Sequence, residues 1–130
     1  MKVTAALRVL GKFAPDEVSR VLGGAPTRVI ARDAGSRLPN EWILTANVDP
    51  SQPLAEHIEW LLKQLEPRAA RLKELERAGH HLGISAGVYV DQDRGMVLSH
   101  PPELLARVGA LGLNLDIDLY PFSPDTAEPG

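Results

Sequence analysis

Apolar and polar side chains alternate along several stretches of the chain, and this alternation predicts β-strands. A period of two places successive side chains on opposite faces of a sheet, so that one face is apolar and the other polar. The pattern is clearest at residues 3–10, 82–90 and 113–120, and a weaker version occupies residues 42–48. Residues 29–31 predict one more, brief strand.

Helical spacing of apolar residues predicts helices between these strands. The strongest stripe lies within residues 54–65, where leucine and isoleucine recur three and four apart directly after a proline, as in a helix packed on a core. Pro67 should kink or break this helix before a second piece ends at Gly79. Shorter helices are predicted from Pro15 and from Pro101, because proline suits the first helical turn.

The order of these elements predicts one α+β domain over residues 1–120. Residues 91–95 read as a hairpin turn toward a short strand at residues 96–98. Strands and helices do not alternate strictly, which favours a largely antiparallel sheet with helices packed on one face. A ferredoxin-like arrangement is the closest standard topology. Residues 121–130 contain three prolines and no aliphatic side chain larger than alanine, so we expect a flexible C-terminal tail.

Composition narrows the class of protein. Hydrophobic residues make up 44% and charged residues 24% of the chain, which indicates an ordered globular domain. The absence of cysteine excludes disulfides, thiolate metal sites and a cysteine nucleophile. No apolar run reaches the length of a signal peptide or a membrane span, so we expect a cytoplasmic protein with no membrane partner. Nothing in the composition points to a cofactor.

Charge is distributed unevenly along the chain. The net charge of −3 argues against a general nucleic-acid surface, so no nucleic-acid partner is expected. Residues 1–37 hold seven basic and three acidic side chains, whereas residues 108–130 hold four acidic and no basic ones. The two ends of the sequence therefore carry charge of opposite sign.

Several short motifs occur together and in order over residues 3 to 120. They are Gly11 before Ala14-Pro15-Asp16-Glu17-Val18, then Leu22-Gly23 with Pro26-Thr27, Trp42, His57-Ile58-Glu59-Trp60-Leu61-Leu62, Leu98-Ser99 and Leu115-Asp116-Ile117-Asp118-Leu119-Tyr120. In this combination the chain resembles the bacterial domain of unknown function 4279 (DUF4279). The family carries no assigned activity. Similar small domains include bacterial immunity proteins, so the resemblance implies a binding role by analogy alone.

One motif resembles the active-site serine motif of an enzyme. Gly83-Ile84-Ser85-Ala86-Gly87 fits the nucleophile-elbow pattern, and Asp91 or Asp93 followed by His100 would complete a triad in the matching chain order. That chemistry needs the serine on a sharp turn between strand and helix, whereas Ser85 sits inside an alternating strand. We therefore interpret the glycines as small residues where a helix packs closely on a strand, and predict no catalytic residue.

The four histidines do not form a metal-binding pattern. His57, His80, His81 and His100 include no pair at the i, i+4 spacing of a helix, and adjacent histidines on a strand point to opposite faces. No metal site is predicted, although the fold could bring distant ligands together. His57 and Trp60 share one face of their helix, as a wall of a ligand site or as packing against the sheet, and packing is favoured.

The last strand offers a candidate binding surface. If residues 113–120 form a strand, its polar face carries Asn114, Asp116, Asp118 and Tyr120. The apolar positions between them should enter the core and leave two carboxylates and an aromatic ring for a basic partner. In the alternative, this strand neighbours the first, and its aspartates form cross-strand ion pairs with Lys2 and Arg8.

These observations favour a non-catalytic binding module. The partner would be a protein, either toxin-like, as for an immunity protein, or a second copy of the chain. The alternative is a small-molecule-binding protein or enzyme with a pocket between the helices and the sheet. Its candidate polar groups are His57, Ser85 and His100.

Overall fold

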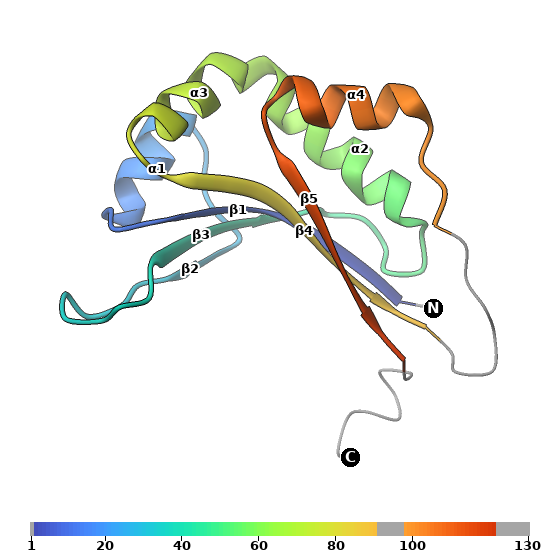
Figure 1. The fold of residues 1–130 in the computed structure, drawn as a ribbon, viewed down its shortest axis with the longest axis horizontal. Helices are drawn as coiled ribbons and strands as arrows, with labels where there is room; N and C mark the ends of the chain where they lie inside the picture. The colour runs from blue at the N-terminus through green and yellow to red at the C-terminus, as the bar shows by residue number, and fades with distance from the viewer. Residues whose placement is uncertain (1, 91–97, 122–130) are drawn as a thin grey trace.

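All the helices lie on one side of a twisted five-stranded sheet (Figure 1). The computed structural model describes residues 2–90 and 98–121 of the chain. Within them the strands are β1 (Lys2–Gly11), β2 (Arg28–Ile30), β3 (Asn40–Thr45), β4 (His81–Tyr89) and β5 (Asn114–Tyr120). The helical segments are α1 (Pro15–Leu22), α2 (Leu54–Leu65), the 3-10 turn η1 (Glu66–Arg68), α3 (Ala69–Arg77) and α4 (Pro102–Ala110). The predicted α+β class, with helices on one face of the sheet, is confirmed.

The sheet is mixed, with the strand order β2-β3-β1-β4-β5. The central strand β1 runs antiparallel to both β3 and β4, whereas β5 runs parallel to β4. A parallel pair needs a crossover connection, and this one contains α4. The largely antiparallel sheet is thus as predicted. The ferredoxin-like arrangement is not confirmed, because in that arrangement all neighbouring strands are antiparallel.

Proline and glycine set the ends of the helices as the sequence predicts. Pro15 occupies the first turn of α1, and Gly23 ends it with a φ of 75°, in the left-handed region that glycine adopts without strain. Pro67 lies in η1, the 3-10 turn that interrupts the long helical stripe between α2 and α3. No helix among the described residues is long and apolar enough to cross a membrane.

The core lies between the sheet and the helices. One face of β1 contributes Val3, Leu7 and Val9, all fully buried. Facing them, α2 buries an apolar stripe made by Leu54, Ile58, Leu61, Leu62 and Leu65. Between α1 and the sheet, the buried Trp42 side chain donates a hydrogen bond from Nε1 to Ser19 Oγ at 3.0 Å, which satisfies the polar atom of its ring.

One predicted strand has other bounds in the structure, and another lies mostly outside the described residues. The strand expected at residues 42–48 begins at Asn40 and ends at Thr45. Beyond it the segment keeps two backbone hydrogen bonds with β1, from the Ala46 N–H to the Ala5 carbonyl and from the Val3 N–H to the Pro50 carbonyl. The predicted hairpin and its strand at residues 96–98 fall almost entirely outside the described residues, and Leu98 is not in a strand. Residues 122–130 of the predicted tail also lie outside them.

The packing of α2 on β1 predicts the effect of shortening a core leucine. Leu62→Ala should lower the free energy of unfolding by about 2–5 kcal/mol, because Leu62 is fully buried and its removal leaves a cavity. Urea denaturation measures this change. Leu105→Ala, the same substitution at a leucine 46% exposed on α4, should cost less than about 1 kcal/mol. Equal losses would contradict the assignment of the core to this interface.

Candidate functional site

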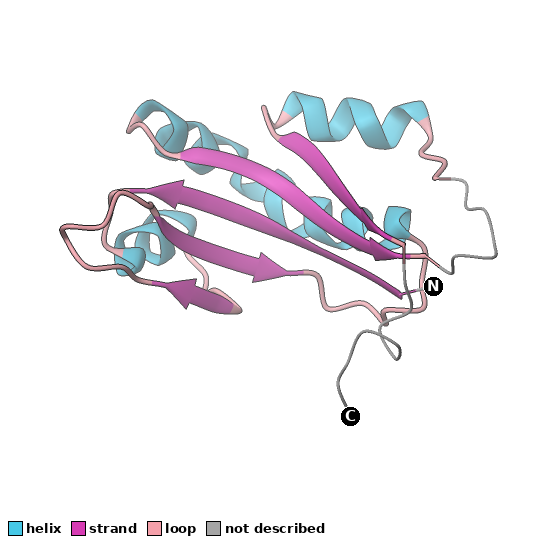
Figure 2. Ribbon diagram, turned by 60° about the horizontal axis from the view of Figure 1, so that its bottom comes forward, coloured by secondary structure: helices cyan, strands magenta, loops and turns pink. Residues whose placement is uncertain are grey.

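The face of the sheet turned away from the helices is uncovered by other described elements. Figure 2 shows the strands in front and the helices behind them. We call this surface the open face. Strand alternation assigns its residues, because Val3, Leu7 and Val9 enter the core and their neighbours Thr4 and Arg8 therefore point outward.

Small side chains on the two central strands hollow out the open face. In the register, Ala6 of β1 lies beside Ser85 of β4, and Thr4 lies beside Gly87. Larger side chains from these two strands and from their neighbours stand around them. The resulting hollow has a volume of about 510 Å³, and its lining includes Arg8, Arg28, Thr45, Tyr89, Asp118 and Tyr120.

The glycines of β4 on this face have residues of the adjacent strands β1 and β5 as their neighbours, at ordinary contact distance. A Cβ atom on Gly87 would lie 3.4 Å from Thr4 Oγ1 and 3.6 Å from a ring carbon of Tyr120. A Cβ atom on Gly83 would lie 3.5 Å from the Asn114 carbonyl oxygen. The interpretation that these glycines allow a helix to pack closely is therefore wrong, because their neighbours belong to adjacent strands.

Two tyrosines form one end of the hollow. Tyr89 and Tyr120 are paired in the register of β4 and β5, and their rings stack with centroids 4.7 Å apart and planes 19° from parallel. Both side chains are only partly exposed. The stacked pair gives this end of the hollow a firm aromatic wall with polar hydroxyl groups.

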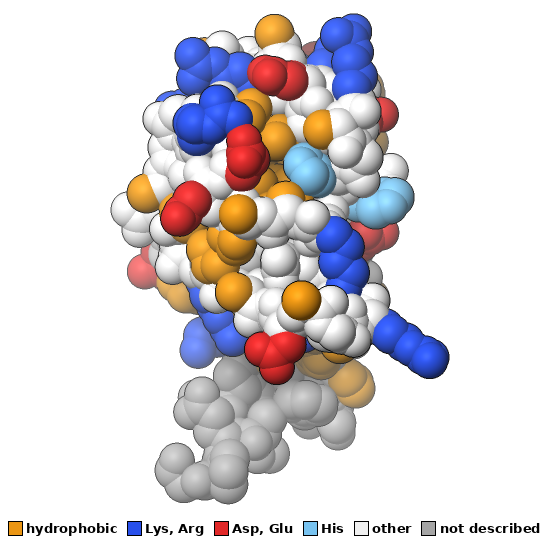
Figure 3. Space-filling model, turned by 90° about the vertical axis from the view of Figure 1, so that its left-hand side faces the viewer, with side chains coloured by type: hydrophobic (Ala, Val, Ile, Leu, Met, Phe, Trp, Pro, Cys, Tyr) orange, Lys and Arg blue, Asp and Glu red, His pale blue; other side chains and the backbone are white. Residues whose placement is uncertain are grey.

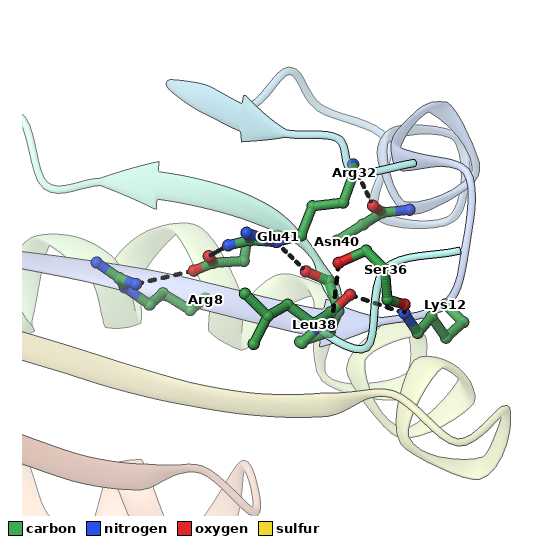
Figure 4. Close-up of polar contacts among 8 residues, drawn as sticks. Arg8, Lys12, Arg32, Ser36, Leu38, Asn40 and Glu41 are labelled. Carbon is green, nitrogen blue, oxygen red and sulfur yellow. Dashed lines mark hydrogen bonds and ion pairs between the residues drawn. The ribbon is translucent and has the colours of Figure 1, made fainter. Parts of the chain in front are cut away.

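A buried carboxylate organises the basic end of the open face (Figure 4). Glu41 accepts one hydrogen bond from Arg8 and one from Arg32, each at 2.9 Å and each to a different carboxylate oxygen. Its side chain is only 12% exposed, so its charge is balanced inside the protein rather than by water. Two guanidinium groups around one carboxylate leave a net positive charge at this place.

The loop between β2 and β3 is tied down beside this network. Arg32 Nε donates to the Pro39 carbonyl at 2.8 Å, and Asn40 accepts a hydrogen bond from the Arg32 backbone N–H at 2.7 Å. Lys12 Nζ donates to the carbonyl of Leu38 at 2.7 Å and to that of Ser36. These bonds hold the loop after β2 beside the network, and the pairing of β2 with β3 places Arg28 at the hollow.

The predicted polar residues of the last strand all lie on the open face. Asp118 and Tyr120 line the hollow, and Asn114 and Asp116 occupy the same face of β5. Asp116 and Asp118 are exposed and have no ion pair with any described residue.

The alternative of cross-strand ion pairs with the first strand is wrong, because β4 separates β5 from β1. The expectation that every apolar position of β5 enters the core also fails at one residue. Leu119 is 58% exposed, because β5 is an edge strand of the sheet.

The predicted site residues of the helix, His57 and Trp60, lie on the other side of the sheet from the hollow. His57 is 1% exposed in α2, and Trp60 packs against the core from the same helix. Neither ring nitrogen of His57 or of His100 has a hydrogen-bond partner among the described residues. Ser85 lies in the middle of β4 on the opposite, open face, and His100 is not among the residues that line the hollow there. Asp91 and Asp93, the other candidates for a triad, lie outside the described residues. The described residues contain no cluster of three or more potential metal ligands.

Described residues on the helix side line two smaller cavities. One, of about 190 Å³, is bounded by α3 and the starts of β4 and β5, and includes Glu76, His80 and His81. His80 packs edge-on against Phe13, and burial lowers its pKa below the ordinary 6.5. The other, also about 190 Å³, lies between the C-terminal ends of α1 and α2 and β3. Neither His57 nor His100 lines these cavities or the hollow.

Charges on the end of the molecule formed by α1, α3 and the loop between β2 and β3 are mixed. Figure 3 shows basic and acidic side chains interspersed there, with hydrophobic side chains between them. This end therefore carries no extended field of one sign.

The sequence contained signals for the hollow that the interpretation of single motifs missed. Gly83, Ser85 and Gly87 are two apart, so a strand must place these small residues on one face. Arg8 is on the polar face of the first strand by the same alternation. No local pattern shows that Arg28 and Glu41 share this face, because that depends on the pairing of β2 with β3 and of β3 with β1.

Comparison with known proteins gives one match. A family model described as "Domain of unknown function (DUF4279)" matches residues 1–122. No curated protein and no solved structure matches the chain.

The Glu41 network predicts unequal costs for two glutamate substitutions. Glu41→Ala should lower the free energy of unfolding by about 1–3 kcal/mol, because Arg8 and Arg32 lose their shared acceptor. Glu17→Ala removes an exposed ion pair with Arg20 and should change the free energy of unfolding by less than about 1 kcal/mol. Thermal and urea melts compare the two, and a harmless Glu41→Ala would show that the network does not stabilise this end.

Proposed function

The chain belongs to the DUF4279 family, and we propose that it is a non-catalytic binding module whose open face docks a protein partner. The observation that carries this proposal is the hollow of about 510 Å³ in an uncovered sheet face, lined by hydroxyl groups, stacked tyrosines and charges of both signs. An antiparallel sheet commonly leaves one face to water, but such a face needs no hollow and no unpaired charge. Together these features favour a docking surface.

The lining of the hollow supports binding rather than catalysis. A serine nucleophile needs a base within hydrogen-bond reach and donors that stabilise the developing charge. Ser85 lies on a regular stretch of β4, and no histidine is among the residues that line the hollow. Among the described residues that line it, Asp118 is the only carboxylate, and it is exposed.

A protein fits the open face better than a small molecule does. Small-molecule sites bury most of their ligand between walls, in pockets of roughly 300–1,000 Å³. The hollow has enough volume, but it is a depression in one sheet surface, and none of the described elements faces it (Figure 2). The two cavities described above on the helix side, where the sequence suggested a pocket, are lined by described residues and are only about 190 Å³ each. A protruding part of a protein partner can fill a depression of this kind.

Filling the hollow should abolish docking. Ser85→Trp places a large side chain on the floor of the hollow. The tagged variant should therefore capture at least tenfold less of any host protein that the tagged wild-type chain captures. Quantitative mass spectrometry of the captured proteins measures this loss. Ala70→Trp adds the same side chain at an exposed position of α3 and should capture as the wild type does.

The class of partner follows from what is captured. A toxin-like protein lost by Ser85→Trp but kept by Ala70→Trp would support an immunity role. Equal capture by both variants, with both melting like the wild type, would overturn the proposal, because docking would then not involve the open face.

A further inference from the structure

We propose that the open face pairs with a second copy of the same chain, so that two sheets pack face to face in a symmetric dimer. The inference rests on the proposed function, because it names the partner at the same surface. Its observation is a division of charge across that surface into a basic half and an acidic half.

The basic half comprises β2, β3 and β1. Arg28 is exposed and has no ion pair or hydrogen bond with a described residue. Arg8 is 44% exposed although it shares Glu41 with Arg32, so the network keeps a positive charge beside the hollow. The acidic half is β5, with the unpaired Asp116 and Asp118. The open face of β4, between the halves, is uncharged from Gly83 to Tyr89.

A two-fold axis brings these halves together. In a symmetric dimer the same patch serves both copies. Attraction then requires that the basic strands β2 and β3 of each copy meet the acidic strand β5 of the other. An axis parallel to the strands, in the plane between the two sheets, reverses the strand order of the second copy. It places β5 of one copy opposite β2 and β3 of the other. In the register Arg28 shares a row with Asn114, so on each side of the axis Arg28 lies two residues, about 7 Å along β5, from the level of Asp116 of the other copy.

The size of the face is compatible with a weak dimer. Five strands about 4.8 Å apart and about six residues long present roughly 500 Å² per copy. Two copies bury about 1,000 Å², near the lower limit for a specific interface. The small residues at the centre, among them Ala6 and Gly87, leave space for side chains or water of the opposite sheet.

The edges of the sheet are less suited to self-association. Antiparallel pairing of two β5 edges centred on Ile117 would set Asp116 of one copy directly against Asp118 of the other. Like charges placed opposite each other destabilise such a pair. At the other edge, β2 is only three residues long. Charges therefore favour pairing through the open face and oppose this pairing of two β5 edges.

Exchange of charges tests the dimer directly. Sedimentation equilibrium of the wild-type chain should show a monomer–dimer equilibrium that weakens at high ionic strength. Arg28→Glu alone, and Asp116→Lys with Asp118→Lys, should each raise the dissociation constant at least tenfold, because both contacts become repulsive. An equimolar mixture of the two variants should form a heterodimer at least as tight as the wild type, since both contacts are attractive again.

Controls separate this inference from the proposed function. Arg77→Glu makes the same charge change at an exposed position of α3 and should leave the dissociation constant unchanged. Circular-dichroism melts verify folding, and Arg28→Gln replaces Arg28→Glu if the latter unfolds. A wild-type chain that stays monomeric at every concentration, or a mixture that stays monomeric, overturns the dimer. If Ser85→Trp nevertheless loses a captured host protein, the open face docks that protein instead and the proposed function stands.

Discussion

Placing every helix on one side of the sheet is the constraint on which the rest of the structure depends. The alternation of β1 sends Val3, Leu7 and Val9 under α2, and the same alternation sends Thr4 and Arg8 to the other face. No described element remains to cover that face. Its side chains must therefore be compatible with water or with a partner, which explains why the outward positions of β1 and β4 around the hollow, from Thr4 to Arg8 and from Gly83 to Gly87, are small or polar.

The open face nevertheless contains one deeply placed charge. Glu41 is shielded by the stems and heads of Arg8 and Arg32, and an unpaired carboxylate in that position would be costly. Because one carboxylate is shared by two arginines, the network both fixes the loop after β2 and leaves positive charge. Structure and electrostatics of the basic end thus have the same origin.

The sequence predicted local features well and pairing poorly. Periodicity identified α2 and the alternation of β1, since those patterns reflect burial on one face. Proline and glycine correctly marked the ends of α1. The position of β5 was not predictable, because its alternation is the same whether it pairs with β1 or with β4. The placement of Asp118 and Tyr120 on a polar face followed from the sequence, but the hollow beside them needed the strand order.

The parallel pairing of β4 with β5 separates the acidic residues of β5 from the basic residues of β1. The basic residues of the open face come from the first part of the chain, and its exposed acidic residues come from the last strand. If β5 lay beside β1, Lys2 and Arg8 would neutralise Asp116 and Asp118 within one sheet. Instead, β4 lies between β1 and β5 with an uncharged open face and keeps these two strands about 10 Å apart. Their side chains are therefore not cross-strand neighbours, which is the arrangement that ion pairs within a sheet require. The asymmetry of charge along the sequence therefore becomes an asymmetry across one surface, where a partner of complementary charge can use it.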